Sequence, residues 1–88
     1  MAKTKQRTSL ERYDAALEVS PGTIVLIRNG DFYETFREGA EVAAKILGLT
    51  LTTMEKGESI PMVGFPAHSV DDYLMKLIKA GYRCSVME

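Results

Sequence analysis

The chain has little of what builds covalent cross-links and metal sites: one cysteine, Cys84, one histidine, His68, and no tryptophan. A single cysteine cannot form an intramolecular disulfide, which suits a reducing compartment. One cysteine and one histidine together cannot supply the ligands of a zinc site. We therefore expect no metal ion and no other cofactor. We expect Cys84 in a strand or in the core, and His68 in packing or hydrogen bonding rather than in catalysis.

The sequence also lacks the motifs of common nucleotide-binding and hydrolytic enzymes. It contains no phosphate loop ending in Gly-Lys-Ser or Gly-Lys-Thr and no Gly-x-Ser-x-Gly turn. A metal-dependent nuclease would need several carboxylates beside a lysine. Only the pairs Asp31 with Glu34 and Glu55 with Lys56 approach this pattern, and nothing else supports them. We predict that the chain is not an enzyme, with a small nuclease as the least favoured alternative.

Long hydrophobic runs are missing as well. Every apolar stretch is shorter than the ~18 residues that a membrane span requires. The first residues do not form the apolar segment of a secretory signal. These absences predict a cytoplasmic protein without a membrane segment.

The chain carries little net charge, −1 at neutral pH. Domains that bind nucleic acid tightly on their own usually have a clear basic excess. The first seven residues carry a formal charge of +3, from Lys3, Lys5 and Arg7, so residues 8–88 carry a net charge of −4. We predict a flexible basic tail over residues 1–8, with a contact to the DNA backbone as its less favoured role.

Apolar spacing predicts a first helix over residues 9–19, with Ser9 as its N-terminal cap. Pro21 ends this helix because proline cannot continue it. The next five residues, 23–27, are apolar or β-branched and too few for a helix, so they predict a buried strand.

A second pair of elements follows the turn predicted at residues 29–31, Asn-Gly-Asp. Residues 32–35 predict a short strand. From about residue 36 the period changes to that of a helix, which Gly48 ends. The apolar face of this helix is formed by Phe36, Ala40, Ala43, Ala44 and Leu47.

The third pair of elements is a predicted hairpin. Residues 49–53 alternate as a strand does, residues 55–59 form a polar turn, and residues 60–65 form a second strand. Pro61 lies inside that strand, which predicts an edge strand or a bulge.

A last helix and strand complete the pattern. Ser69 and Asp72 have the spacing of a capping box, and Gly81 ends the helix. Residues 82–86 alternate as a final strand. The apolar stripe of the helix consists of Val70, Tyr73, Leu74, Leu77 and Ile78.

These elements predict one α/β (α+β) domain over residues 9–88. Its chain order is α, β, β, α, β, β, α, β. Such a pattern indicates a mixed sheet of about four to five strands covered by about three helices.

One stretch is unusual because a turn is followed directly by two aromatic residues, Phe32 and Tyr33, and then by Glu34. Strand alternation places Phe32 and Glu34 on one face and Tyr33 on the other. A carboxylate is costly to bury without a partner, so Phe32, on the same face, is a candidate for exposure. The alternative, in which both rings join the core, is the commoner fate of phenylalanine.

Two motifs resemble the mismatch-recognition domain of the MutS family of DNA repair proteins. The first is Gly-Asp-Phe-Tyr-Glu-Thr-Phe at residues 30–36. The second is Ile-Pro-Met-Val-Gly-Phe-Pro-Ala-His-Ser-Val at residues 60–70. The similarity runs from about Thr23 to the end of the chain, and the motifs occur in the family's order.

The resemblance implies the fold of MutS domain I and recognition of irregular DNA. In that family the phenylalanine of a Phe-x-Glu motif wedges beside a mispaired base from the minor groove, and the glutamate hydrogen-bonds that base. Carried over, these residues are Phe32 and Glu34, with Asn29, Met62 and Gly64 as further DNA-contacting residues. The implied partners are double-stranded DNA with mispairs or small loops, and other repair proteins, in a nucleoid-associated location.

The sequence departs from the family pattern at several positions. Thr53 and Met54 stand where the family usually has a basic pair, Asn29 replaces a usual methionine, and Ala67 replaces a usual aromatic residue. The family's clamp, lever and ATPase regions are not among these 88 residues. We therefore expect weak DNA binding by the chain alone. The main alternative is a protein-interaction or regulatory domain that kept the fold and lost DNA binding.

Overall fold

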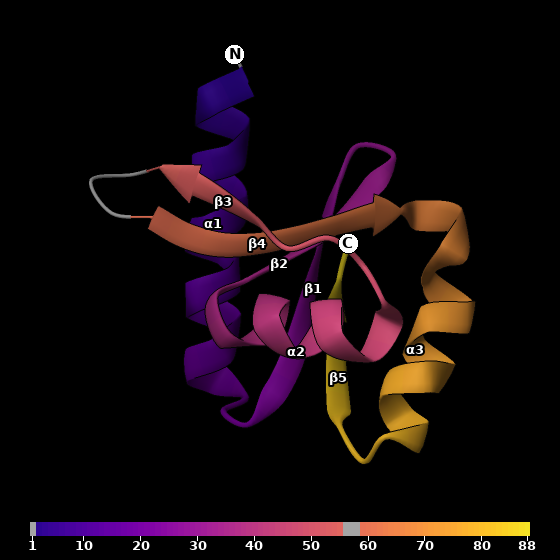
Figure 1. The fold of residues 1–88 in the computed structure, drawn as a ribbon. Helices are drawn as coiled ribbons and strands as arrows, with labels where there is room; N and C mark the ends of the chain where they lie inside the picture. Colours follow the sequence, from indigo (N-terminus) through magenta and orange to yellow (C-terminus); the bar gives the residue numbers. More distant parts are fainter. Residues whose placement is uncertain (1, 56–58) are drawn as a thin grey trace.

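The computed structural model describes residues 2–55 and 59–88, with the backbone alone described for residues 2–8. The elements follow the predicted order of helix, two strands, helix, two strands, helix and strand (Figure 1). The prediction of an α+β domain is therefore confirmed. The bounds are α1 Ala2–Val19, β1 Thr23–Asn29, β2 Phe32–Phe36, α2 Arg37–Leu47, β3 Thr52–Glu55, β4 Ser59–Pro66, the 3₁₀ turn η1 Ala67–Ser69, α3 Val70–Lys79 and β5 Arg83–Met87.

The five strands form one mixed sheet in the order β3-β4-β2-β1-β5. β1 and β5 are parallel, and the other neighbouring pairs are antiparallel. β1 and β2 form a tight hairpin in the middle of the sheet, in which Asn29 lies opposite Phe32. The hairpin is thus supported on both sides by other strands.

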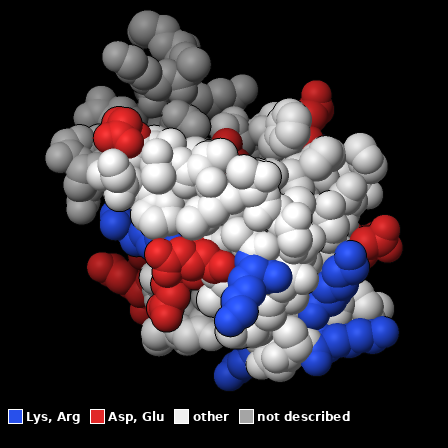
Figure 2. All heavy atoms as spheres, in the orientation of Figure 1, with Lys and Arg blue, Asp and Glu red and all other residues white. Residues whose placement is uncertain are grey.

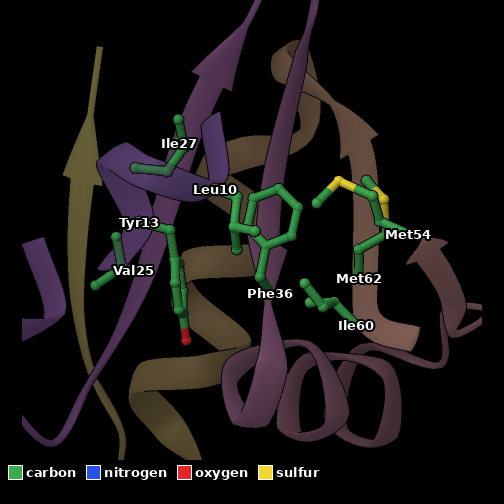
Figure 3. Close-up of a cluster of buried hydrophobic side chains, with 8 residues drawn as sticks. All are labelled: Leu10, Tyr13, Val25, Ile27, Phe36, Met54, Ile60 and Met62. Atoms are coloured by element: carbon green, nitrogen blue, oxygen red, sulfur yellow. The ribbon is translucent and has the colours of Figure 1, made fainter. Parts of the chain in front are cut away.

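Helices cover both faces of the sheet, because the residues of β1 alternate between two cores (Figure 1). Val25 and Ile27 belong to the core beneath α1, whereas Ile24 and Leu26 belong to the core beneath α2 and α3. Figure 3 shows the first core, which consists of Leu10, Tyr13, Val25, Ile27, Phe36, Met54, Ile60 and Met62. Burial of apolar surface on both faces fixes the strand register, since a shift by one residue would exchange the faces.

The first helix is longer than the sequence predicted. α1 begins at Ala2, so Ser9 is not its N-cap, and Ser9 is instead buried inside the helix. Lysine, glutamine and arginine, which dominate residues 3–7, are good helix formers, and neither proline nor glycine occurs before Pro21. The flexibility of residues 1–8 stays a prediction.

β3 begins later than predicted, at Thr52 rather than at residue 49. Gly48 ends α2 in the left-handed conformation, with φ 70°, and the next residues lead across to the sheet. Only from Thr52 onward does the chain pair with β4. The prediction of a polar turn at residues 55–59 falls mostly on residues 56–58, which lie outside the described residues, while Glu55 belongs to β3 and Ser59 to β4.

The expectation of an edge strand at Pro61 was wrong, because β4 lies between β3 and β2. The ladder between β2 and β4 ends at the pair Phe36 and Met62. Pro61 lies just beyond that pair and faces only Thr53 of β3. The missing N–H of proline therefore breaks no bond to β2.

α3 begins after Ser69 as predicted, but the capping box is absent. Ser69 makes no side-chain capping hydrogen bond, and its backbone (φ −95°, ψ 1°) is not extended as a capping residue requires. Instead η1 runs directly into the helix, and the Val70 N–H donates to the Ala67 carbonyl. Ile78 is exposed rather than part of the buried stripe. The helix contacts the core through Val70, Tyr73, Leu74 and Leu77.

Candidate nucleic-acid interface

The β1–β2 hairpin projects from one end of the sheet, and its turn is built by Gly30 and Asp31. Gly30 has φ 65°, a left-handed conformation that side chains disfavour, so glycine is the residue that suits this turn. β2 starts immediately after the turn with Phe32. The turn therefore places an aromatic side chain at the very beginning of a strand, at the end of the sheet.

Phe32 is 49% exposed, whereas Tyr33 beside it is 2% exposed. The prediction that Phe32 is exposed is confirmed. Phe32 lies on the α1 face, because it shares that face with Phe36, four residues along the same strand. At Phe36 this face is packed against α1, since Leu10 and Tyr13 belong to the same core. No such cluster of buried residues includes Phe32.

Glu34 lies on the same face as Phe32 and is only 9% exposed. Asn29 Nδ2 donates a hydrogen bond of 3.3 Å to Glu34 Oε1. This bond gives a partner to a carboxylate that would be costly to bury alone. Sequence reasoning predicted the shared face but missed the burial of Glu34 and its partner.

Two of the further predicted contact residues separate in the structure. Gly64 lies directly opposite Glu34 in β4 and is exposed. Met62 is buried in the first core, next to Phe36. The structure therefore brings together Asn29, Phe32, Glu34 and Gly64, which we call the recognition surface. It does not bring Met62 to that surface.

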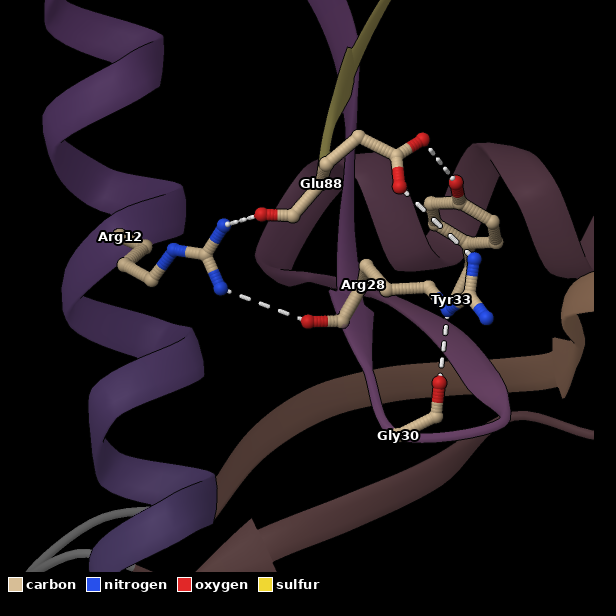
Figure 4. Close-up of polar contacts among 5 residues, drawn as sticks. All are labelled: Arg12, Arg28, Gly30, Tyr33 and Glu88. Carbon is tan, nitrogen blue, oxygen red and sulfur yellow. Dashed lines mark hydrogen bonds and ion pairs between the residues drawn. The ribbon is translucent and has the colours of Figure 1, made fainter.

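Polar contacts behind the hairpin hold its turn in place (Figure 4). Arg28 Nε donates to the Gly30 carbonyl at 2.7 Å. Arg28 Nη1 lies 3.8 Å from Glu88 Oε1, and the Tyr33 hydroxyl donates to Glu88 Oε2 at 2.9 Å. Arg12 of α1 donates to the Glu88 carbonyl at 2.7 Å. The sequence carries no signal for this network, since its members come from α1, the hairpin and the last residue.

Lysine and arginine side chains are unevenly distributed over the face drawn in Figure 2. Figure 2 shows Lys and Arg gathered over α3 and the lower end of the view. Among the side chains described on this face, none of the Lys or Arg lies over the upper part, above β4.

The next features are the possible metal ligands and the one cysteine, Cys84. Within residues 2–55 and 59–88, no three His, Cys, Asp or Glu side chains lie close enough to hold a metal ion. Cys84 lies in β5, packed against the second core, as predicted. Burial raises the pKa of its thiol, which disfavours the reactive thiolate. No helix in the described part of the chain has the length and apolarity to cross a membrane.

A mixed sheet between helices, with an exposed aromatic ring at a hairpin turn, defines a small α+β domain. A family model described as MutS domain I matches residues 8–88. The chain belongs to this family.

Several curated relatives are each called "DNA mismatch repair protein MutS". The protein from Bartonella quintana is 47% identical over 88 residues, which cover 98% of this chain and 10% of the relative. The protein from Rhodopseudomonas palustris strain BisA53 is 45% identical over 89 residues, 99% of this chain and 10% of the relative. The protein from Rhodopirellula baltica is 48% identical over 81 residues, 90% of this chain and 9% of the relative. The chain thus spans about a tenth of the length of these relatives.

Proposed function

We propose that this chain is a DNA mismatch-recognition module that inserts the Phe32 ring into irregular duplex DNA from the minor groove. The observation that carries the proposal is the 49% exposure of Phe32 beside a buried, hydrogen-bonded Glu34 at the end of the sheet. The names of the relatives give the setting, mismatch repair. We expect the module to bind without catalysing a reaction.

The physics of a wedge suits this ring. An aromatic side chain inserted at a base step takes the place of a lost stacking neighbour, which is worth roughly 1–3 kcal/mol. Unstacking a normal step costs a few kcal/mol, so insertion into matched DNA gains little. A mispair or an unpaired nucleotide is already weakened, so the same insertion costs less there. Discrimination then arises from the DNA rather than from a basic surface.

Glu34 adds selectivity to the wedge. Asn29 occupies one carboxylate oxygen, Oε1, and leaves Oε2 to accept an N–H from a base. A negative charge near phosphates also opposes binding to normal duplex. Because Glu34 is 9% exposed, we propose that the ring enters first and that the irregular base then reaches the carboxylate.

Binding by the chain alone should be weak, because one wedge with few cations makes a small interface. Nonspecific binding of about 10⁻⁴–10⁻⁶ M sets the scale. Other repair proteins, or the remaining length that the relatives have, would supply further contacts in the cell. The proposed place of action is cytoplasmic DNA.

Fluorescence anisotropy with labelled matched and mismatched duplexes at one low salt concentration tests the proposal. The Phe32→Ala variant should lose about 5- to 150-fold in affinity for the mismatched duplex, the equivalent of one stacked base. Tyr82→Ala is the matched control, because Tyr82 is also an exposed aromatic residue but lies at the opposite end of the sheet from Phe32. Tyr82 directly precedes β5, and the first residue pair of β5 with β1 is Arg83 with Thr23. Equal effects of the two substitutions would contradict a wedge at Phe32.

A second candidate function is a protein-interaction domain that kept the fold without DNA binding. One observation favours it: Met75 and Ile78, one turn apart on α3, are both more than half exposed. If neither duplex binds at millimolar DNA while the chain is folded, this second function becomes the better account.

A further inference from the structure

Asn29, the one asparagine of the chain, ends β1 directly before the hairpin turn. Its Nδ2 donates to Glu34 Oε1 at 3.3 Å, and no other described residue forms a hydrogen bond with this side chain. An asparagine beside a turn commonly bonds the backbone of that turn. Here the amide is bonded to Glu34 instead, so it acts on the recognition surface rather than on the turn.

Apart from Asn29, the neighbours of the Glu34 carboxylate in the sheet give it no hydrogen bond. In β1 the residue opposite is Ile27, which is buried and apolar, and in β4 it is Gly64, which has no side chain. A Cβ at Gly64 would lie 3.8 Å from Glu34 Cγ, so glycine leaves this side of Glu34 open. The last torsion of a glutamate side chain has no sharply preferred angle. The bond from Asn29 therefore decides how the carboxylate is turned.

The two oxygens of the Glu34 carboxylate differ in their surroundings. Oε1 accepts the hydrogen bond from Asn29, whereas Oε2 is bonded to none of the described residues. Thr35 Oγ1 is the one described side-chain nitrogen or oxygen that is fully buried without a partner, so Oε2 still touches solvent. An ionised carboxylate only accepts hydrogen bonds. Oε2 is thus the atom of Glu34 that an N–H from outside the protein can reach.

The backbone that carries Asn29 is held from two sides. On one side Arg28 Nε donates to the Gly30 carbonyl at 2.7 Å (Figure 4). On the other side the Ala67 N–H donates to the Asp31 carbonyl at 2.8 Å, which ties the end of β4 to the turn. A group that is fixed before binding loses less conformational entropy when its ligand arrives. The Asn29 amide is therefore anchored well enough to orient a second side chain.

We propose that Asn29 is a positioning residue for recognition of an irregular base: it holds Glu34 Oε1 and thereby presents Oε2 to an N–H of that base. Asn29 itself does not contact the DNA in this account, and it sets selectivity through Glu34 alone. The inference rests on the proposed function and deepens it, because it names the residue that orients the base acceptor.

A double-mutant cycle of Asn29→Ala and Glu34→Ala tests the proposal. Fluorescence anisotropy at one low salt concentration gives the affinities for a matched duplex and for a duplex with one G·T mispair. Asn29→Ala should lower the ratio of mismatched to matched affinity at least about twofold, and by no more than Glu34→Ala does. In the Glu34→Ala background, Asn29→Ala should change the ratio no further, because the two residues act as one unit.

Thr23→Val is the matched control, because it also removes one side-chain hydrogen bond of β1. The Thr23 hydroxyl donates to the Ser20 carbonyl at 2.8 Å, at the other end of the strand from Asn29. Thr23→Val should leave the ratio of the two affinities unchanged. Circular dichroism verifies that each variant is folded.

A second measurement examines the contact without DNA. Since Asn29 is the one asparagine, a chain labelled with ¹⁵N-asparagine shows a single side-chain amide in the NMR spectrum. Its ¹⁵N relaxation should show a restrained amide in the unmodified chain and in Thr23→Val, and a more mobile amide in Glu34→Ala. Equal mobility in all three chains would overturn the proposed positioning.

The binding results can overturn the proposal in two ways. An unchanged ratio in Asn29→Ala would show that Glu34 needs no positioning. Losses that add up in the double variant would show that Asn29 contacts the DNA independently of Glu34. Equal affinity of the unmodified chain for both duplexes would instead defeat the proposed function, and the inference with it, even where the relaxation data show a restrained amide.

Discussion

The two ends of strand β2 carry the same side chain in opposite surroundings. Phe36 is fully buried, and its ring packs edge to face against Tyr13 of α1, with centroids 5.7 Å apart. Phe32, on the same face of the same strand, is 49% exposed and starts directly after the hairpin turn. The two residues differ in what covers the sheet, not in strand geometry.

This contrast separates a residue that stabilises the core, Phe36, from the one that we propose for DNA contact, Phe32. A large ring left half exposed contributes little to the core, although its removal from water would be favourable. At the exposed end the ring has polar neighbours, Asn29 opposite it in β1 and Glu34 two residues along, beside one apolar neighbour, Pro66 in β4. At the buried end they are apolar. This difference in surroundings is why we propose the exposed end, and not the buried one, as the DNA-contacting surface.

The largest expected effect comes from removing each ring in turn. Phe36→Ala should lower the free energy of unfolding by ~3–5 kcal/mol, the usual cost for a buried phenylalanine. Phe32→Ala should lower it by less than about 1 kcal/mol, because exposed substitutions away from special features have small effects. Urea denaturation of both variants gives the comparison. Similar losses would show that Phe32 belongs to the core.

Substitution of two glycines, Gly39 near the buried end of β2 and Gly64 beside Glu34, tests the same contrast with smaller expected changes in stability. A Cβ at Gly39 would lie 2.7 Å from Thr35 Oγ1 and 2.8 Å from the Tyr13 hydroxyl, so Gly39→Ala should cost ~1–3 kcal/mol through overpacking. A Cβ at Gly64 would lie 3.6 Å from the Tyr33 carbonyl oxygen, an ordinary contact. Gly64→Ala should therefore change stability by less than about 0.5 kcal/mol. Thermal melts distinguish them, and a costly Gly64→Ala would contradict an open recognition surface.

Substitution of Glu34 should change the selectivity for mismatched over matched DNA more than it changes the overall affinity for DNA. Glu34→Ala removes a charge that repels phosphates, so affinity for matched DNA should rise or stay level. It also removes an acceptor for a base, a hydrogen bond worth ~0.5–1.5 kcal/mol. The ratio of mismatched to matched affinity should fall about 2- to 13-fold at fixed salt. An unchanged ratio, with both duplexes bound, would show that Glu34 does not read the base.

The smallest expected effect is a change in the stability of the fold at alkaline pH, caused by Tyr13 at the buried end of β2. Burial raises the pKa of Tyr13 above its usual value of 10.0, although a hydrogen bond from the Gly39 N–H acts in the other direction. Because the folded-state pKa is the higher one, the stability from neutral Tyr13 is complete below about pH 10 and is lost as pH rises through the folded value. Tyr13→Phe should unfold with a weaker dependence on pH above 10 than the unmodified chain. Identical pH dependence would contradict a buried, neutral Tyr13.

Local patterns predicted the element order, the stop of α2 at Gly48 and the exposure of Phe32, because turns and periodicity are encoded in neighbouring residues. Features that depend on distant residues were missed. The N-terminus of α1 lies well before Ser9, since capping spacing is weaker evidence than continuous helix propensity. The position of β4 inside the sheet depends on pairing with two other strands.

At the recognition surface too, features set by neighbouring residues were predicted and features set by distant residues were missed. The sequence predicted Phe32 and Glu34 from alternation and from the MutS resemblance. It did not predict that Asn29 holds Glu34, nor that Glu88 supports the hairpin through Arg28, since these contacts form only in the folded chain. DNA contact at Asn29 and Gly64 stays a prediction. Met62 is buried in the core away from this surface.

An NMR titration of the isotopically labelled chain with matched and mismatched duplexes tests the central claim most directly. At low salt the mismatched duplex should shift the signals of Phe32, Glu34 and Gly64 at lower DNA concentration than the matched duplex does. Signals of Met75 and Ile78 on α3 should stay unchanged. Shifts confined to α3, or identical shifts with both duplexes, would contradict the account that the exposed end of β2 recognises irregular DNA.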